Sequence, residues 1–187
     1  MTEKDIFIGS IKYIQRKIKD ILEKVSQEDI NDFIDLFFNS NRIFVYGAGR
    51  SGLVAKAFAI RLVHLGFQTF VIGETITAPV QKGDLVIIIS GSGETIPAVM
   101  TAEIANNLGA YVVSITAKKR SEIAKFANIS LFISSYCKEE ERRRYAPLGT
   151  LFEASVWILL DGIVAYLLDS KKETEEFMRS RHATLEQ

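Results

Sequence analysis

The clearest chemical feature of the sequence is a Gly- and Ser-rich loop directly after a continuous apolar run. Residues 85–95 read LVIIISGSGET, and a helical pattern restarts at Pro97. Ser90, Ser92 and Thr95 give this loop hydroxyl groups, and its glycines leave backbone N–H groups open to close approach. The following helix would direct the positive end of its dipole at the loop. These features predict a phosphate site, although the loop alone also fits a plain strand-to-helix turn.

A second loop of this kind, GAGRSG at residues 47–52, comes earlier in the chain. Its candidate ligand contacts are Gly49 through its backbone, the Arg50 side chain and the Ser51 hydroxyl. The loop also matches the dinucleotide fingerprint G-x-G-x-x-G, and Glu74 lies about where such a site places its ribose-binding acid. That fingerprint seldom contains Arg-Ser and leaves the loop SGSGET unexplained. The presence of two such loops favours one small phosphorylated ligand over a dinucleotide.

Few residues could move a proton. Glu153 follows a loop with Pro147 and Gly149 and opens a long apolar helix, so its carboxylate is expected to be partly removed from water. An acid that only stabilises the helix dipole is the alternative, and the residues alone leave both open. The chain has two histidines. His182 lies in the charged segment RSRHATLE, typical of a solvated helix end, and His64 ends a predicted helix as a packing or capping residue.

Charge and composition exclude several classes of function. Lys plus Arg and Asp plus Glu both total 23, so no net field attracts nucleic acid or an anionic membrane. The run EEERRR at residues 139–144 is predicted to be a solvated helix turn or loop. The charged N-terminus lacks the apolar core of a signal peptide, and the single Cys137 excludes a disulfide framework or a cysteine metal cluster. These features predict a cytoplasmic protein.

The longest apolar stretch, Leu151–Leu168, approaches the length of a membrane span. Glu153 and Asp161 would both be costly in lipid, which favours a buried helix instead. A helix that is apolar nearly all round suits a place between a sheet and a partner subunit. The sequence therefore predicts a homo-oligomer.

Residues 1–40 are predicted to form an N-terminal helical element. Apolar residues recur at helical spacing over 6–25. Ser26 caps a second helix, whose stripe of apolar residues ends at Phe38. We expect this pair to serve packing or dimerisation. A DNA-reading helix pair is the rival, but the exposed face mixes acids with bases.

Strand and helix patterns alternate over the rest of the chain. We predict strands at 42–46, 67–72, the apolar run from Leu85, 111–115 and 129–133, with helices at 53–65, 97–108 and 121–126. This rhythm predicts an α/β fold with a parallel sheet, helices on both faces and right-handed crossovers. Ligands of such sheets bind at the carboxyl ends of the strands, where both loops lie. We expect one domain over 1–187, with the α/β core, a C-terminal helix and a tail in 41–187.

The loops GAGRSG and SGSGET resemble the two phosphosugar-binding loops of the sugar isomerase (SIS) domain family. The segments VIGETITAP, APLGTLFE and RHATLE are similar to those of one group within it, the 6-phospho-3-hexuloisomerases. The resemblance covers residues 41–187, and the tail departs from the group only in Thr184, where Asn is common. It implies a five-stranded parallel sheet flanked by helices, doubly wound in the flavodoxin-like manner.

The activity implied by the resemblance is the interconversion of D-arabino-3-hexulose 6-phosphate and D-fructose 6-phosphate. This reaction belongs to the ribulose monophosphate route for formaldehyde and needs no cofactor or metal. The enzymes that catalyse it form tetramers. The matching glutamate is the catalytic base, a role that passes to Glu153. The tail of a neighbouring subunit supplies a histidine, which makes His182 the proton shuttle or acid, with His64 in reserve. Ser51, with the hydroxyls of Ser90, Ser92 and Thr95, would hold the phosphate.

Three alternatives stay open at this point. A non-catalytic SIS module that senses a sugar phosphate would not need Glu153. An aldose–ketose isomerase of the same family would differ in which carbon exchanges its proton. A dinucleotide oxidoreductase would bind nicotinamide.

Overall fold

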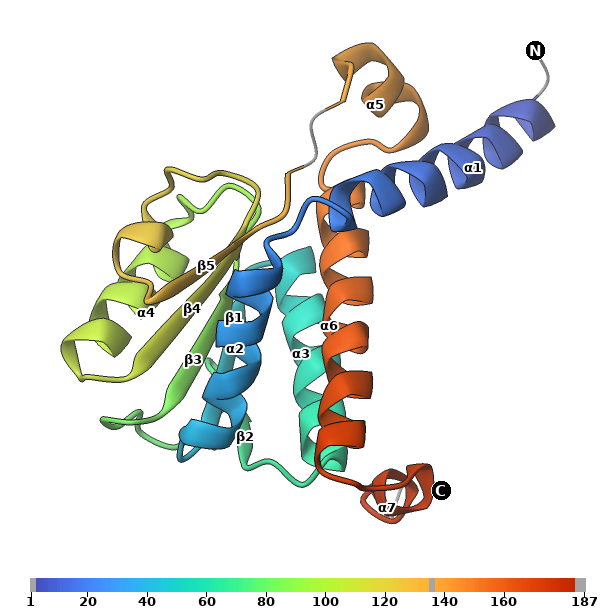
Figure 1. Ribbon diagram of the computed structural model, residues 1–187. Coiled ribbons are helices and arrows are strands. Elements are labelled where there is room, and N and C mark those ends of the chain that lie inside the picture. The colour runs from blue at the N-terminus through green and yellow to red at the C-terminus, as the bar shows by residue number, and fades with distance from the viewer. Residues whose placement is uncertain (1–2, 135–136, 184–187) are drawn as a thin grey trace.

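The computed structural model describes residues 3–134 and 137–183, so the last three residues of the RHATLE segment, from Thr184 on, lie outside the described residues. The helices and strands follow one another along the chain as shown in Figure 1. Their bounds are α1 Glu3–Leu22, α2 Gln27–Asn39, β1 Ile43–Gly47, α3 Arg50–His64, β2 Thr69–Val71, β3 Leu85–Ile89, α4 Ile96–Asn107, β4 Tyr111–Thr116, a 3-10 turn Ile123–Lys125, β5 Ile129–Phe132, α5 Glu139–Tyr145, α6 Thr150–Ser170 and α7 Glu175–Arg179.

The five strands form one all-parallel sheet in the order β2-β1-β3-β4-β5, which confirms the predicted fold class. Strand β3 is central, and all five of its side chains are fully buried because helices cover both faces. The strand predicted at 67–72 is shorter than expected, at three residues. The chain turns from one half of the sheet to the other between β1 and β3, so ligands are expected at the carboxyl ends of these two strands.

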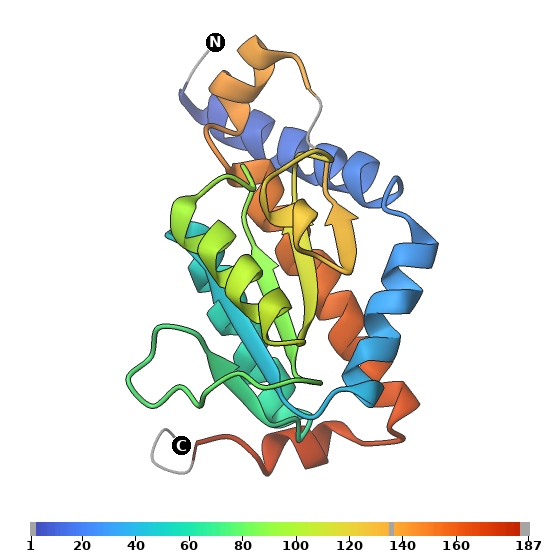
Figure 2. The ribbon, with the colours of Figure 1, turned by 90° about the vertical axis from the view of Figure 1, so that its left-hand side faces the viewer.

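Helices α3 and α6 pack over one face of the sheet, and α4 and the 3-10 turn over the other (Figures 1 and 2). The first face holds the larger core, to which α2 contributes the buried residues Phe33, Ile34 and Phe37. Helix α1 lies against α6 and α5. The N-terminal pair therefore packs on the α/β core, as predicted.

Helix α6 is long and apolar enough to cross a membrane by length and composition, and 44% of its most apolar window is buried. Its buried side chains, among them Val156, Leu160 and Leu167, belong to the core with the sheet and α3. The predicted burial against the sheet is thus present. Its outer face still exposes Trp157, Ile158 and Tyr166.

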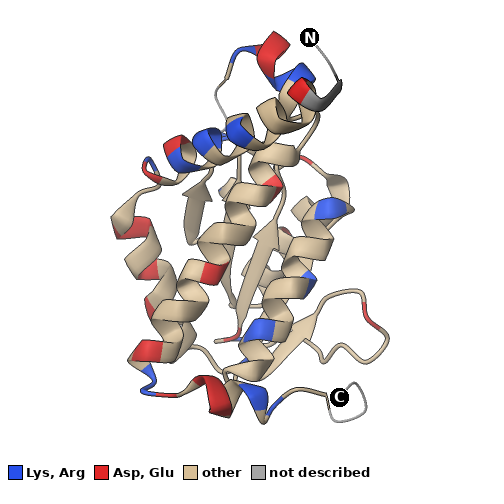
Figure 3. Ribbon diagram, turned by 90° about the vertical axis from the view of Figure 1, so that its right-hand side faces the viewer, with Lys and Arg blue, Asp and Glu red and all other residues tan. Residues whose placement is uncertain are grey.

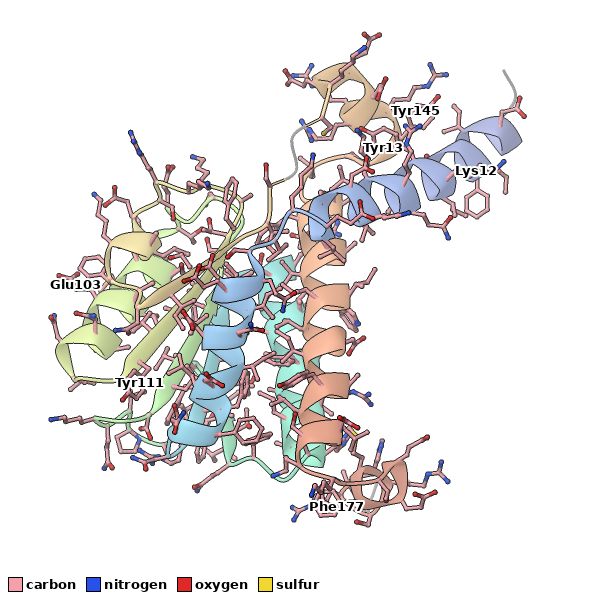
Figure 4. All side chains as sticks on the ribbon, in the orientation of Figure 1. Lys12, Tyr13, Glu103, Tyr111, Tyr145 and Phe177 are labelled. Carbon is pink, nitrogen blue, oxygen red and sulfur yellow. The ribbon has the colours of Figure 1, made fainter. Side chains whose placement is uncertain are left out.

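Two short helices lie at opposite ends of the long pair α3 and α6 (Figure 1). At the upper end, α5 rests on α1, where the rings of Tyr13 and Tyr145 lie 5.5 Å apart (Figure 4). At the lower end, the C-terminal tail (residues 171–183) carries α7, with Phe177 next to the end of α3. For α5 the sequence predicted a solvated helix turn or loop, and α7 was not predicted.

Candidate active site

The loop after β3 is held in shape by its own hydroxyl groups. Ser90 Oγ accepts a hydrogen bond from the N–H of Gly93, and Ser92 Oγ accepts one from the N–H of Glu94. Gly93 has φ +64°, and a Cβ there would lie 2.4 Å from Ser121 Cβ, so this position requires glycine. Thr95 opens α4 without capping it through its side chain, and its hydroxyl lies 3.4 Å from that of Ser92. Because Ser90 and Ser92 act as acceptors in these bonds, their O–H groups can still donate to a ligand, and the Thr95 side chain does not cap the helix.

The loop after β1 makes a tight turn into α3. A Cβ on Gly47 would lie 2.7 Å from the Ser51 backbone, and one on Gly52 would lie 2.5 Å from the Gly47 carbonyl oxygen. The glycines thus let the strand end and the helix start touch, which brings Ser51 over the end of the sheet. Gly49 has φ +57° with open space where a Cβ would be.

Both loops open into one cavity of about 370 Å³, here called the loop cavity. From the predicted site it gathers Ser51, Ser90, Ser92, Thr95 and Glu153. Its volume lies within the range of small-molecule sites. The hydroxyls and the carboxylate, which come from three distant parts of the sequence, therefore face one space. Gly49 and Arg50 do not line it; Arg50 lines a neighbouring groove of about 430 Å³ between α3 and α6.

Glu153 lies on the first turn of α6, and its side chain is only 13% exposed. Its carboxylate folds back over Gly149, where a Cβ would lie 2.8 Å from Oε1 and 2.9 Å from Oε2. Arg50 Nε lies 2.9 Å from Oε2, an ion-pair distance, but Oε2 accepts no hydrogen bond from the described part of the chain. The two charges attract at this distance whatever the direction of the N–H bond. The carboxylate is thus held beside a cation in the cavity wall, in a fixed position that a general base would need.

Arg142 is the site residue that sequence reasoning missed. Residues 139–144 were expected to be solvated, which is correct for Arg143, paired with Glu139 on the surface, but wrong for Arg142. Arg142 is half-buried, lines the loop cavity and donates a hydrogen bond to the Leu148 carbonyl at 3.3 Å. Among the described residues that line the cavity it is the one cation. Nothing in a run of three arginines distinguishes it, since its place depends on how α5 docks on α1.

His182 lies away from the loop cavity of its own chain. It stacks on His64, the last residue of α3, whereas Arg50 at the first residue lies beside Glu153. At 1.5 Å per residue, the two ends of α3 are about 21 Å apart. One chain alone therefore does not bring His182 to Glu153, and the predicted role of His182 depends on a neighbouring copy.

Residues 36–148 match the SIS domain, more than half of the chain. The chain belongs to the SIS domain family. A Bacillus subtilis protein named 3-hexulose-6-phosphate isomerase is 39% identical, with 87% of this chain and 89% of that protein covered. An uncharacterized Archaeoglobus fulgidus protein is 38% identical, with 94% and 98% covered.

Among solved structures, one from Methanococcus jannaschii superposes with a TM-score of 0.85 at 31% identity, covering 95% of this chain and 99% of that one. Its authors infer for that protein the function of a 3-hexulose-6-phosphate isomerase. Together with the cavity, these relatives make this SIS protein a phosphosugar isomerase.

Proposed function

We propose that the protein interconverts D-arabino-3-hexulose 6-phosphate and D-fructose 6-phosphate. The observation that carries the proposal is the Glu153 carboxylate, held by Arg50 in the wall of the cavity that both loops share. SIS domains bind phosphosugars. The relatives named 3-hexulose-6-phosphate isomerase support this substrate over other phosphosugars.

The phosphate would be bound by Ser51 and by the hydroxyls of the loop after β3, at the start of α4. Glu153 then takes the proton from C2 of the 3-hexulose, and the electron pair forms the C2–C3 double bond while charge collects on the C3 oxygen. A proton passes from the C2 hydroxyl to that oxygen, and Glu153 returns its proton to C3, which leaves the carbonyl at C2. Arg50 and Arg142 are the cations near enough to offset the developing charge.

His182 would reach this site from a second copy of the chain. The outer face of α3 and α6 exposes Leu53, Ile60, Trp157, Ile158 and Tyr166, and Figure 3 shows basic residues spaced along α3 and acidic residues along α6. Two copies packed through this face about a two-fold axis, with their α3 helices antiparallel, would place the tail of one near the loop cavity of the other. Two such pairs would give the tetramer expected from the sequence.

Substrate chemistry suggests what His182 does. With the ketone at C3 and O6 esterified, the 3-hexulose cannot close a five- or six-membered ring, whereas fructose 6-phosphate cyclises through O5. Only the reverse direction needs an acid for ring opening. Loss of His182 should therefore harm reverse turnover at least as much as forward turnover.

Proton NMR of fructose 6-phosphate with the purified protein in heavy water tests the reaction. Loss of the C3 proton signal is expected with the wild type. With Glu153→Gln the signal should remain. Loss at C1 would indicate an aldose–ketose isomerase instead. No exchange, together with no 3-hexulose formed, would favour a sensing module.

Mixing two inactive variants tests the shared site. Glu153→Gln supplies an intact His182, and His182→Ala supplies an intact Glu153. If each site draws on two copies, random exchange of subunits should restore about a quarter of the reverse activity, because half of the pairs are mixed and each has one intact site. No recovery after proven subunit exchange would place both residues of a site on one chain.

A further inference from the structure

The two histidines of the chain lie face to face at the lower end of α3. Their ring centroids are 4.1 Å apart and their planes differ by 25°. His64 is buried, at 6% exposure, and His182 is exposed at the end of the tail. A ring fixed in the fold therefore covers one face of a ring that is otherwise in solvent, and this limits the orientations open to His182.

Packing alone does not explain why a histidine occupies position 64. Its Nδ1 atom is buried and has no hydrogen-bond partner among residues 3–134 and 137–183, a cost that an apolar side chain of similar size would avoid. Burial, followed by the nearby His182 and Arg61, lowers the pKa of His64. The ring is consequently uncharged at neutral pH, so it adds no positive charge against the face of His182.

The rest of the tail holds the backbone of His182 in place. Met178 is buried in the core on the α3 side of the sheet. A Cβ on Gly66 would lie 3.4 Å from the Phe177 ring and 3.5 Å from the Arg181 guanidinium, so both side chains cover that glycine. The tail is thereby docked up to the residue before His182, and His64 contacts the side chain that follows.

We propose that His64 is a positioning residue whose ring holds the His182 imidazole in the orientation that serves the loop cavity of a second copy. The inference rests on the proposed function, which gives His182 its part in proton transfer. His64 itself would touch no substrate. It would act through His182 only.

The stack can be measured without any activity assay, since a protein with two histidines gives two Hε1 proton signals. In the wild type the His182 signal should lie upfield of free histidine because the His64 ring is stacked against the His182 ring. His64→Phe keeps a ring of similar size and should keep this shift, and His64→Leu keeps an apolar side chain but should move the signal toward that of free histidine. An unchanged signal in His64→Leu would overturn the inference.

Kinetics then separate positioning from mere packing. His64→Leu should lower kcat for fructose 6-phosphate by about 10- to 100-fold with little change in KM, the scale expected when a catalytic group is misplaced. His64→Phe should retain turnover. Equal turnover in both variants, with the NMR shift lost only in the leucine variant, would refute the positioning role. A wild type without C3 exchange would instead refute the proposed function, while the NMR comparison would still report on the stack.

Discussion

Gly149→Ala should disable the base while leaving the fold in place. The new Cβ would lie 2.8 Å from Glu153 Oε1 and 3.0 Å from Cδ, whereas ordinary contacts of this kind begin at 3.4 Å. The carboxylate must therefore move by about 0.6 Å, the difference between these two distances. Because the obstructing atoms end a flexible side chain, and because Gly149 has an ordinary φ of −80°, the backbone is not strained.

The expected effect on turnover follows from this displacement. A misplacement of about 1 Å costs on the order of 100-fold in rate, so kcat should fall by about 10- to 100-fold. This corresponds to about 1.4–2.7 kcal/mol in the activation barrier. The stability change should stay within about 1 kcal/mol, the scale of an Ala at a helix N-cap.

The assay is C3 proton exchange of fructose 6-phosphate in heavy water, with urea unfolding of the same preparations. Gly162→Ala is the matched control, since Gly162 lies inside the same helix and a Cβ there meets no atom within 4 Å. It should gain about 0.5–1 kcal/mol of stability, which measures the effect of an added methyl group inside this helix away from Glu153. A Gly149→Ala protein with wild-type kcat would refute the reasoning that the observed carboxylate position is the catalytic one.

Three further outcomes are expected. Gly93→Ala combines a positive φ with a clash against Ser121, so urea unfolding should show a loss of at least about 1–3 kcal/mol; unchanged stability would contradict the described loop. Asp84→Ala should lose about 3 kcal/mol in the same assay, because it strands Arg42, whose Nη2 lies 2.7 Å from the buried carboxylate. Burial lowers the pKa of His64, so the neutral ring stabilises the fold above the ordinary histidine pKa and this contribution fades as the pH falls below it. The urea midpoint should thus drop between about pH 7 and pH 5, and drop less in His64→Phe; equal slopes in both proteins would exclude His64 as the source.

Much of the fold could be predicted because its signals are local. The apolar run from Leu85 reads as a buried strand, and Gly66 and Gly109, with φ values of +84° and +78°, end helices where the sequence places them. The alternation of strands and helices then leaves one plausible sheet, with both loops at one edge. The hydroxyls of Ser90, Ser92 and Thr95 were assigned to a ligand site on the same grounds.

The positions of the short helices could not be predicted because these helices are stabilised by docking. Helix α5 has seven residues and three arginines, and it is positioned by the contact of Tyr145 with Tyr13 on α1. A helix this short is not stable alone. Its place, and with it the place of Arg142 on the loop cavity, depends on residues more than a hundred positions away in the sequence.

The sequence by itself determined the chemical inventory: two phosphate-type loops, one glutamate at the start of an apolar helix, and two histidines. Only the tertiary structure decided how these parts meet. It placed Glu153 over Gly149 in the same cavity as both loops, selected Arg142 from three adjacent arginines, and set His182 on His64 away from that cavity. The physical reason is that residue type and local periodicity are written in neighbouring residues, whereas the distance between catalytic groups is set by packing between segments far apart in the chain.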